Sequence, residues 1–405
     1  MNAPERKAVS ALAAIFALRM FGLFMLLPVL APYAARLEAS TPLRVGLALG
    51  VYGLTQGLLQ IPFGMMSDRF GRKIVIAAGL GLFIVGSAVA ALADSIEWLI
   101  IGRAIQGAGA ISSAVLALTA DLTRARQRTK AMAVIGVSIG AVFLLSLMLA
   151  PPLASALGVP GIFWLTAVLA LAALGVLRWI ALAPVSSSLP SSSPPPSSPP
   201  TPRPPIRRIL AHAQLLRLNL GVFVLHLALI AMFVVLPTLL HAKSGLALAA
   251  HWRLYAPVLI LSVVGMLPLI RLASRPRGVG PAFTAAVALL LASCVAMAWA
   301  AVGGGGDGRG LWPLLCALWL FFVAFNALEA MLPSLVSRIA PAADKGAALG
   351  VFNTFQFLGM FAGGVGAGWI SGWAGAPGVY WLCAALVGAW LAREIAAPRL
   401  RLADE

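Results

Sequence analysis

Twelve apolar runs of about 20 residues, the length that a helix needs to cross a bilayer, limit what this chain can fold into. Of the 405 residues, 61% are hydrophobic, which is more apolar surface than a globular core of this size can bury. The sequence therefore predicts an all-α membrane protein with twelve transmembrane helices, whose expected spans are 9–35, 43–66, 73–93, 97–119, 130–152, 160–183, 214–240, 252–270, 280–302, 311–336, 346–370 and 378–396.

A Pro- and Ser-rich segment separates the sixth and seventh runs. Residues 184–206 offer no apolar face, which is typical of a disordered linker. Residues 1–183 and 207–405 are then expected to form two pseudo-symmetric six-helix bundles. The run FMLLPVL at Phe24 recurs as FVVLPTL at Phe233, in the first helix of each half, as expected for a duplicated fold.

The distribution of basic residues predicts the orientation in the membrane. Of the 29 Lys and Arg residues, 22 fall on the side that carries both termini and the linker, and five fall on the other. By the positive-inside rule that first side is cytoplasmic, and the chain is expected in a bacterial-type inner (plasma) membrane. The formal net charge of +17 thus reflects orientation in a bilayer, and no nucleic-acid partner is expected.

The predicted turn between the second and third helices, GMMSDRFGRK, carries four charges in ten residues. It resembles the signature loop of the major facilitator superfamily, G-x-x-x-D-R-x-G-R-R/K, through Gly64, Asp68, Arg69, Gly71, Arg72 and Lys73.

Two further runs are similar to signatures of the drug:proton antiporter branch of that superfamily. RAIQGAGA in the fourth helix resembles R-x-x-Q-G-x-G-A through Arg103 and Gln106, and GLFMLLPV in the first helix resembles G-x5-P-V. Runs such as LRMFGLFMLLPVL and FFVAFNALEAMLPSL resemble the YajR-like group of efflux transporters. Members of that group can carry a soluble domain after the twelfth helix, which this chain, ending at Glu405, is expected to lack.

The resemblance implies two bundles that rock about a central site lined by helices one, four, seven and ten. An ionisable side chain deep in lipid costs about 2.5 to 3.5 kcal/mol, so it should face water, a partner or a substrate. The deep ionisable residues lie one on each of those helices: Arg19, Arg103, His226 and Glu329. We expect a polar central cavity that includes Arg19, Arg103, Gln106 and Asn326.

Each of these residues is open to more than one interpretation. Glu329 is the predicted carrier of the coupling proton, with a structural ion pair or a contact to a substrate cation as alternatives. His226 is the next candidate for the proton, or an ordinary packed histidine. Arg103 serves structure and coupling or binds substrate, and Arg19 binds backbone carbonyls or an anionic group of the substrate.

Asp68 is expected at the C-terminal end of the second helix, where a carboxylate meets the negative end of the helix dipole and needs another partner. The N-terminus of the eleventh helix, near Lys345, could supply that partner when the cytoplasmic side closes. The YajR-like pattern places Asp121 beside the loop. We therefore predict a cytoplasmic latch made of Gly64, Asp68, Arg69, Gly71, Arg72, Lys73 and Asp121.

The function predicted from these features is proton-coupled efflux of small, amphipathic or drug-like compounds by alternating access. The alternatives are uptake of a metabolite by proton symport, and a channel or sensor without coupled transport. No Ser-His, Asp-Asp or His-rich metal constellation can be placed at one depth, so an enzyme is not expected. No cofactor or metal is predicted, and the expected partners are a small-molecule substrate, protons and the lipid bilayer, with the chain as a monomer.

Overall fold

The computed structural model describes residues 1–180, 206–302, 310–341 and 344–397, which are almost entirely helical. Residues 181–205, which hold nearly all of the predicted linker, lie outside the described part. The helices are α1 (Ala3–Met25), α2 (Leu30–Ala34), α3 (Pro42–Phe70), α4 (Arg72–Ala91), α5 (Ile96–Ala108), α6 (Ser112–Asp121), α7 (Ala125–Trp179), α8 (Ile206–Ala211), α9 (Ala213–Ser244), η1 (Leu248–Ala250), α10 (Trp252–Gly265), α11 (Leu267–Ala273), α12 (Val279–Val302), α13 (Leu311–Ile339) and α14 (Lys345–Ala396).

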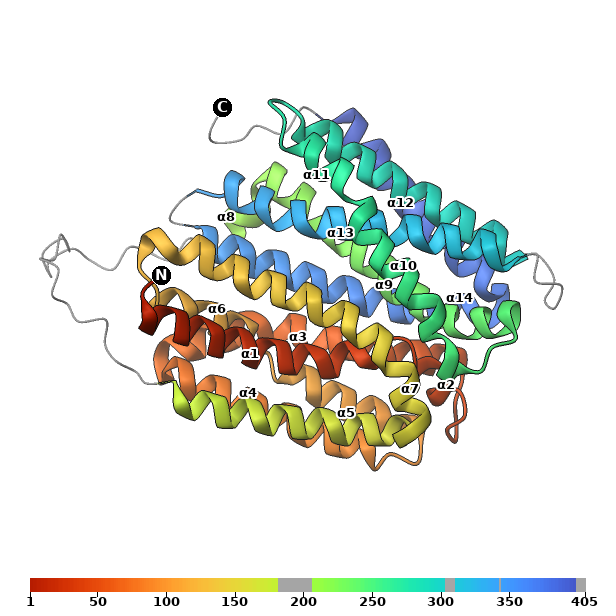
Figure 1. Ribbon diagram of the computed structural model, residues 1–405, viewed down its shortest axis with the longest axis horizontal. Helices are drawn as coiled ribbons and strands as arrows, with labels where there is room; N and C mark the ends of the chain where they lie inside the picture. The colour runs from red at the N-terminus through yellow and green to blue at the C-terminus, as the bar shows by residue number, and fades with distance from the viewer. Residues whose placement is uncertain (181–205, 303–309, 342–343, 398–405) are drawn as a thin grey trace, which may run out of the picture.

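The described helices account for all twelve predicted spans. Nine helical stretches of the described residues are long and apolar enough to cross a membrane, and α3, with 29 residues, runs alongside them (Figure 1). Two of the nine stretches, in α7 and α14, are more than 50 residues long, and each turns back on itself and crosses twice (Figure 1). Helices α5 and α6 together form one span, as do η1, α10 and α11.

Both reversals use one glycine followed two residues later by proline. Gly158 in α7 and Gly375 in α14 have φ of 70° and 61°, in the left-handed region that glycine enters without a steric penalty. Pro160 and Pro377 then start the next helix with a preset φ. The predicted gaps at 153–159 and 371–377 each contain the observed turn, which is shorter than expected because helix continues on both sides of a single non-helical residue.

Three other predicted spans are interrupted. The first helix ends at Met25 before Pro28 and resumes as α2, and the eighth is divided at Met266 before Pro268. The fourth breaks between α5 and α6, where Gly109 has ψ of 53°. Proline explains the first two breaks, since it cannot donate a backbone hydrogen bond.

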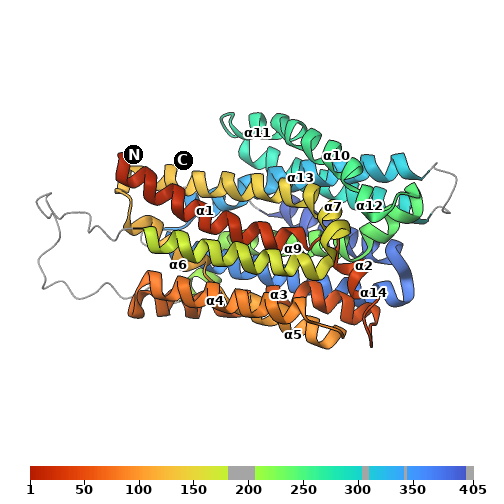
Figure 2. The same cartoon turned by 60° about the horizontal axis from the view of Figure 1, so that its bottom comes forward.

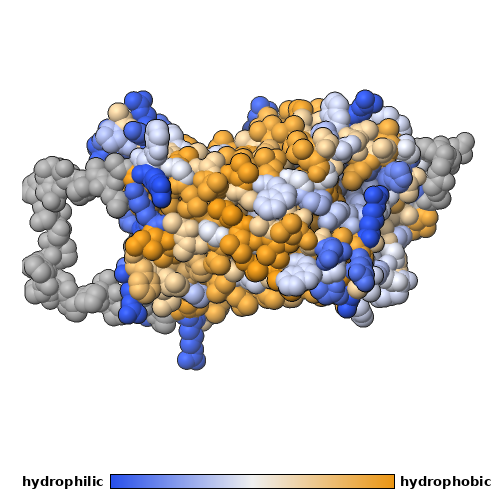
Figure 3. All heavy atoms as spheres, turned by 90° about the horizontal axis from the view of Figure 1, so that it is seen from below, coloured by the Kyte–Doolittle hydropathy of each residue, from blue (hydrophilic) through white to orange (hydrophobic). Residues whose placement is uncertain are grey.

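The helices form two packed groups that meet along α3 and the first half of α14 (Figures 1 and 2). We call inner the end of the molecule that carries the N-terminus of α1, residues 64–73 and α8, and outer the opposite end (Figure 1). Figure 3 shows apolar side chains gathered in a broad belt across the middle of one face, with hydrophilic residues at the two ends. This pattern fits a protein whose helices cross a bilayer.

The contact between α3 and α14 is closest near the outer end. A Cβ atom built on Gly46, Gly50 or Gly53 would collide with backbone atoms of Gly364, Phe361 or Phe357. Toward the inner end, a Cβ atom on Gly346 or Gly350 of α14 would meet nothing within 4 Å. Helices α7 and α10 are likewise close at the outer end, whereas α11 lies well away from α7 at the inner end (Figure 1). The two groups are thus packed together at the outer end and diverge at the inner end.

Candidate functional site

Arg19 lies inside the N-terminal bundle, where its side chain is 1% exposed. Its Nη2 donates hydrogen bonds to Tyr52 Oη (2.7 Å), to Gln56 Oε1 (2.6 Å) and to the carbonyl oxygen of Gly109 (2.9 Å). The break between α5 and α6 makes the Gly109 carbonyl available, since that residue has left the helical conformation. In this conformation Arg19 therefore contacts a backbone carbonyl, as one of its two predicted interpretations requires.

Arg103 contacts the same tyrosine. Its guanidinium carbon is 5.0 Å from the centre of the Tyr52 ring, and its Nη1 donates to Gln106 Oε1 at 2.8 Å. Gln106 in turn donates to Ser87 Oγ on α4 at 2.7 Å. Arg103 is 2% exposed and Gln106 is fully buried, so in this conformation both side chains belong to the interior of the N-terminal bundle.

His226 and Glu329 lie together in the C-terminal bundle. His226 is 5% exposed, and its Nε2 is 3.7 Å from Glu329 Oε2. The Glu329 side chain is 38% exposed, although its Oε2 atom is buried and makes no hydrogen bond in the described structure. Glu329 thus has one carboxyl oxygen that is shielded, while the rest of its side chain is accessible from outside the protein core.

A third residue, Gln356 of α14, completes this group. Gln356 Nε2 lies 2.7 Å from His226 Nε2, and His226 Nδ1 lies 3.2 Å from the carbonyl oxygen of Val222. A carbonyl only accepts hydrogen bonds, so these contacts assign the imidazole proton to Nδ1, and Nε2 accepts from the Gln356 amide. Gln356 is not among the residues predicted from the sequence, although it is a polar side chain within the apolar run 346–370.

Aromatic rings lie directly outward of Glu329. Phe325 precedes Glu329 by one helical turn on α13, and its ring centre is 5.6 Å from that of His226. It also stacks on Phe143 of α7, at 5.9 Å, and Phe143 meets Phe24 of α1 at 5.1 Å. These rings pack between the two bundles and form an aromatic cluster of Phe24, Phe143, Phe322 and Phe325 on the outer side of Glu329.

Asn326 lies on α13 between Phe325 and Glu329. Its Nδ2 donates to Ser262 Oγ of α10 at 3.0 Å, and the residue is half-buried. Asn326 therefore connects α13 to α10, near Glu329, whereas Arg19, Arg103 and Gln106 form a separate cluster in the other bundle. The two clusters approach each other at one point, where Tyr52 packs edge-on against Phe357, the chain neighbour of Gln356, at 6.4 Å.

The inner turn between α3 and α4 brings the predicted latch residues together. Arg72 forms an ion pair with Asp68, and its Nε donates to Asp121 Oδ2 at 3.1 Å. Arg72 Nη1 also donates to Ser67 Oγ (2.6 Å). Gly71, with φ of 95°, turns the chain between the two helices.

The remaining residues of the turn have distinct positions. Lys73 Nζ donates to the carbonyl oxygen of Ile180, just after α7, and so links α4 to that helix. The Arg69 guanidinium lies over the Phe70 ring, 5.4 Å from its centre. At Gly64 a Cβ atom would come within 3.3 Å of Ser113 Oγ on α6, which explains a small residue there. The loop thus holds α3, α4, α6 and α7 together at the inner end.

Comparison with known proteins agrees with this architecture. The family model of the Major Facilitator Superfamily matches residues 12–364. The chain is 41% identical to the inner membrane transport protein YajR of Escherichia coli K12, over 96% of this chain and 83% of that protein. It is 31% identical to an uncharacterised transporter of Buchnera aphidicola from Acyrthosiphon pisum, over 90% of each chain.

Solved structures show the same fold at low sequence identity. The nucleoside transporter NupG superposes with a TM-score of 0.71 at 14% identity, covering 96% of this chain and 99% of that one. Two bundles of six spans, the charged turn at residues 64–73 and the family match lead to one conclusion: the chain is a membrane transporter, not an enzyme, and it belongs to the Major Facilitator Superfamily.

Proposed function

We propose that this protein exports small, amphipathic compounds from the cytoplasm in exchange for protons, by alternating access. The observation that carries the proposal is the pair of Glu329 and His226, two groups that can hold a proton, 3.7 Å apart and directly inward of the aromatic cluster. Substrate would bind in the space beside Glu329, on the inner side of the aromatic cluster.

A proton moving between solvent and this pair would change contacts on a second helix. In the assigned tautomer His226 Nε2 accepts a hydrogen bond from Gln356, so a proton that arrives at Nε2 removes the acceptor. The Gln356 amide must then rotate to present its oxygen. Gln356 belongs to the part of α14 that packs on α3. Protonation of His226 would therefore alter the contact between the two bundles.

The inner latch would stabilise the opposite conformation. In the present arrangement Asp68 pairs with Arg72, and the start of α14, at Lys345 and Gly346, is exposed. When the bundles close at the inner end, the N-terminus of α14 would approach Asp68, and a helix N-terminus attracts a carboxylate by about 0.3 to 1 kcal/mol. This attraction would favour the state that is open at the outer end.

The test is proton-driven transport by the Glu329→Gln variant in proteoliposomes. A fluorescent amphipathic cation such as ethidium serves as the probe, and a pH gradient is imposed across the vesicle membrane. Glutamine keeps the shape of the side chain but cannot exchange a proton, so we expect gradient-driven transport to fall at least about a hundredfold, the low end for loss of a positioned proton-transfer group. Ethidium binding, measured by fluorescence polarisation, should change by less than about threefold.

The matched control is Glu97→Gln, since Glu97 is an exposed acid that pairs with Arg44 at the outer end. That variant should transport like the unmodified protein. Gradient-driven transport that survives in Glu329→Gln would remove Glu329 from the mechanism, and transport with protons moving in the same direction as the probe would contradict exchange.

A further inference from the structure

The outer half of the C-terminal bundle encloses three polar side chains that the transport mechanism does not use. His251, Tyr255 and Tyr380 are each 0% exposed. His251 directly precedes α10, Tyr255 lies in the first turn of α10, and Tyr380 follows the turn at Gly375 in the second half of α14. Glu329 lies toward the inner end of α13, so these three residues form a separate feature of the bundle.

Each of the three side chains has one polar atom without a hydrogen-bond partner among the described residues. These atoms are the hydroxyl oxygens of Tyr255 and Tyr380 and the Nδ1 atom of His251, and all three are buried. His251 Nε2 lies 3.3 Å from the carbonyl oxygen of Leu246. A carbonyl only accepts hydrogen bonds, so this contact assigns the imidazole proton to Nε2 and leaves Nδ1 as an acceptor. The group therefore offers two hydroxyls, which donate and accept, and one nitrogen that only accepts.

The three side chains lie close to one another, together with two cysteines. The ring centres of His251 and Tyr255 are 6.3 Å apart, and the rings meet edge to face. Tyr380 is within electrostatic range of Tyr255 and of the thiols of Cys294 and Cys383. Both cysteines are free, and they are 0% and 2% exposed. Polar groups from α10, α12 and α14 thus gather in one enclosed region.

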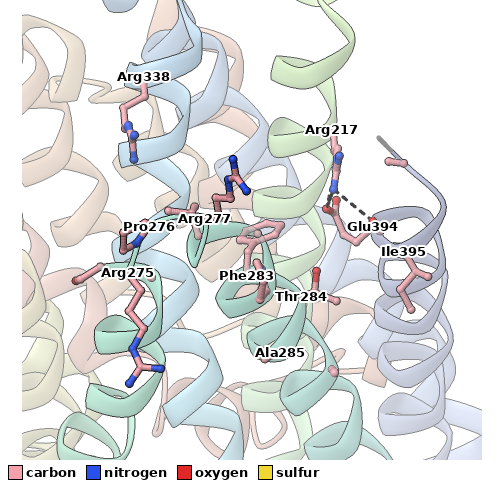
Figure 4. Close-up of a pocket in the computed structure, with 17 residues that line it drawn as sticks. Arg217, Arg275, Pro276, Arg277, Phe283, Thr284, Ala285, Arg338, Glu394 and Ile395 are labelled. Carbon is pink, nitrogen blue, oxygen red and sulfur yellow. Dashed lines mark hydrogen bonds and ion pairs between the residues drawn. The ribbon is translucent and has the colours of Figure 1, made fainter. Parts of the chain in front are cut away.

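Buried polar side chains elsewhere in the protein, such as that of Tyr52, have partners within the chain. Tyr52 is also 0% exposed, but its hydroxyl accepts a hydrogen bond from Arg19 at 2.7 Å. In the lining of the pocket at the inner end of the C-terminal bundle, Arg217 and Glu394 form a buried ion pair (Figure 4). A buried hydroxyl without a hydrogen bond is unfavourable, and in folded proteins such groups are paired with protein atoms or with ordered water.

Water fits the chemistry of the unpaired atoms better than an ion does. The five enclosed side chains include no Asp, Glu, Lys or Arg. Among the described residues, no group of three His, Cys, Asp or Glu side chains is placed to hold a metal ion. A buried water molecule takes about two to four polar partners. It can donate to the His251 nitrogen while it accepts from a tyrosine hydroxyl.

We propose that the outer half of the C-terminal bundle binds ordered water at the hydroxyls of Tyr255 and Tyr380 and at Nδ1 of His251. A bridging water molecule is nearly as favourable in enthalpy as a direct hydrogen bond. The bound water therefore satisfies three atoms that the described residues leave unpaired, and it links α10 to the second half of α14.

The first measurement is radiolytic labelling of the full-length protein in nanodiscs, in which X-rays generate hydroxyl radicals from water, bound water included. Mass spectrometry then gives the rate at which each tyrosine is oxidised. We expect Tyr255 and Tyr380 to be oxidised faster than Tyr52, which is buried to the same extent but has its hydroxyl paired within the chain. Oxidation of Tyr255 and Tyr380 at the rate of Tyr52 would overturn the proposal.

The second measurement is the unfolding temperature of Tyr255→Phe and of Tyr380→Phe, because the sign of the change separates a hydrated site from a dry one. Loss of a hydroxyl that water satisfies should lower the unfolding temperature by about 2 to 4 °C, as expected for one hydrogen bond. Loss of a buried hydroxyl that has no partner would raise it.

Tyr33→Phe is the matched control, since Tyr33 is half-buried in α2 of the other bundle. It should unfold like the unmodified protein. A raised unfolding temperature in either Tyr255→Phe or Tyr380→Phe would show that the hydroxyl is dry and would contradict the proposal.

Discussion

Tyr52 contacts two buried guanidinium groups, those of Arg19 and Arg103, at 5.9 and 5.0 Å from its ring centre. Cations over an aromatic face gain about 0.5 to 2 kcal/mol each, and the hydrogen bonds to Gln56, Gln106 and Gly109 add to this. Neither arginine forms an ion pair in the described structure. The two cations therefore hold the N-terminal bundle together through neutral partners, and the structural interpretation of Arg103 is the one that this geometry favours.

Gln356 also provides a test of how protonation of His226 would affect the conformation of the rest of the protein. Gln356→Met keeps the volume of the side chain but removes the donor to His226 Nε2. Because one hydrogen bond contributes about 0.5 to 1.5 kcal/mol, we expect the conformational equilibrium at neutral pH to shift about two- to tenfold and to lose most of its response to pH.

The measurement is the distance between spin labels at Met65 and Gly346, two exposed inner positions, recorded across a pH series in a background with Cys316→Ser. Gln214→Met, on the first turn of α9 and away from the pair, is the control. If the pH response of Gln356→Met matches that of the unmodified protein, this amide does not couple protonation to the conformational equilibrium.

Helices α3 and α14 pack so closely that their backbones are in contact. Gly53 lies on this contact, and its Cβ atom would collide with the carbonyl oxygen of Phe357. Small residues allow such close approach of helices in membranes. We expect Gly53→Val to prevent full closure at the outer end and to populate the outward-open state.

Labels at Leu43 and Trp373, exposed at the outer ends of α3 and the first half of α14, would report a longer distance in Gly53→Val. Gly81→Val is the control, since a Cβ atom at Gly81 of α4 meets nothing within 4 Å and β-branching lowers helix propensity equally. An unchanged outer distance in Gly53→Val would show that this contact tolerates a larger side chain and does not set the closed state.

The membrane spans could be predicted from the sequence because a helix that crosses the hydrocarbon core must be apolar along its length. The residues of the runs 280–302 and 311–336, for example, meet this requirement by themselves. The predicted gaps at 153–159 and 371–377 contain the turns at Gly158 and Gly375, but hydropathy could not show that each turn is a single residue with positive φ. Hydropathy also does not fix how a helix is rotated about its axis. The sequence therefore predicts Arg19 at the cavity but could not show that, in this conformation, its side chain contacts Tyr52.

For the molecule as a whole, the latch predicts how one charge shifts the balance between its two conformations. Asp68→Asn removes the carboxylate that the N-terminus of α14 would attract at the closed inner end. Since that attraction is about 0.3 to 1 kcal/mol, and about 2 kcal/mol when partly buried, the outward-open population should fall between about twofold and thirtyfold.

Transport of ethidium should fall with it, while the amount of protein in the membrane stays unchanged. The same inner label pair, Met65 and Gly346, reports the population, and Asp94→Asn in the exposed outer turn after α4 serves as the control. Normal transport by Asp68→Asn would exclude the latch.

The glycine turns within α7 and α14 leave the two helices that each turn joins little freedom to move relative to each other. The first half of each element faces the opposite bundle, and the second half returns toward the inner end on the flank of its own bundle (Figures 1 and 2). Because only one residue in each turn is non-helical, we expect each hairpin to tilt as one unit about its outer corner when the bundles move. The flanking helices would contact lipid tails, so we expect membrane thickness and fluidity to affect how readily these hairpins tilt and therefore the rate of transport.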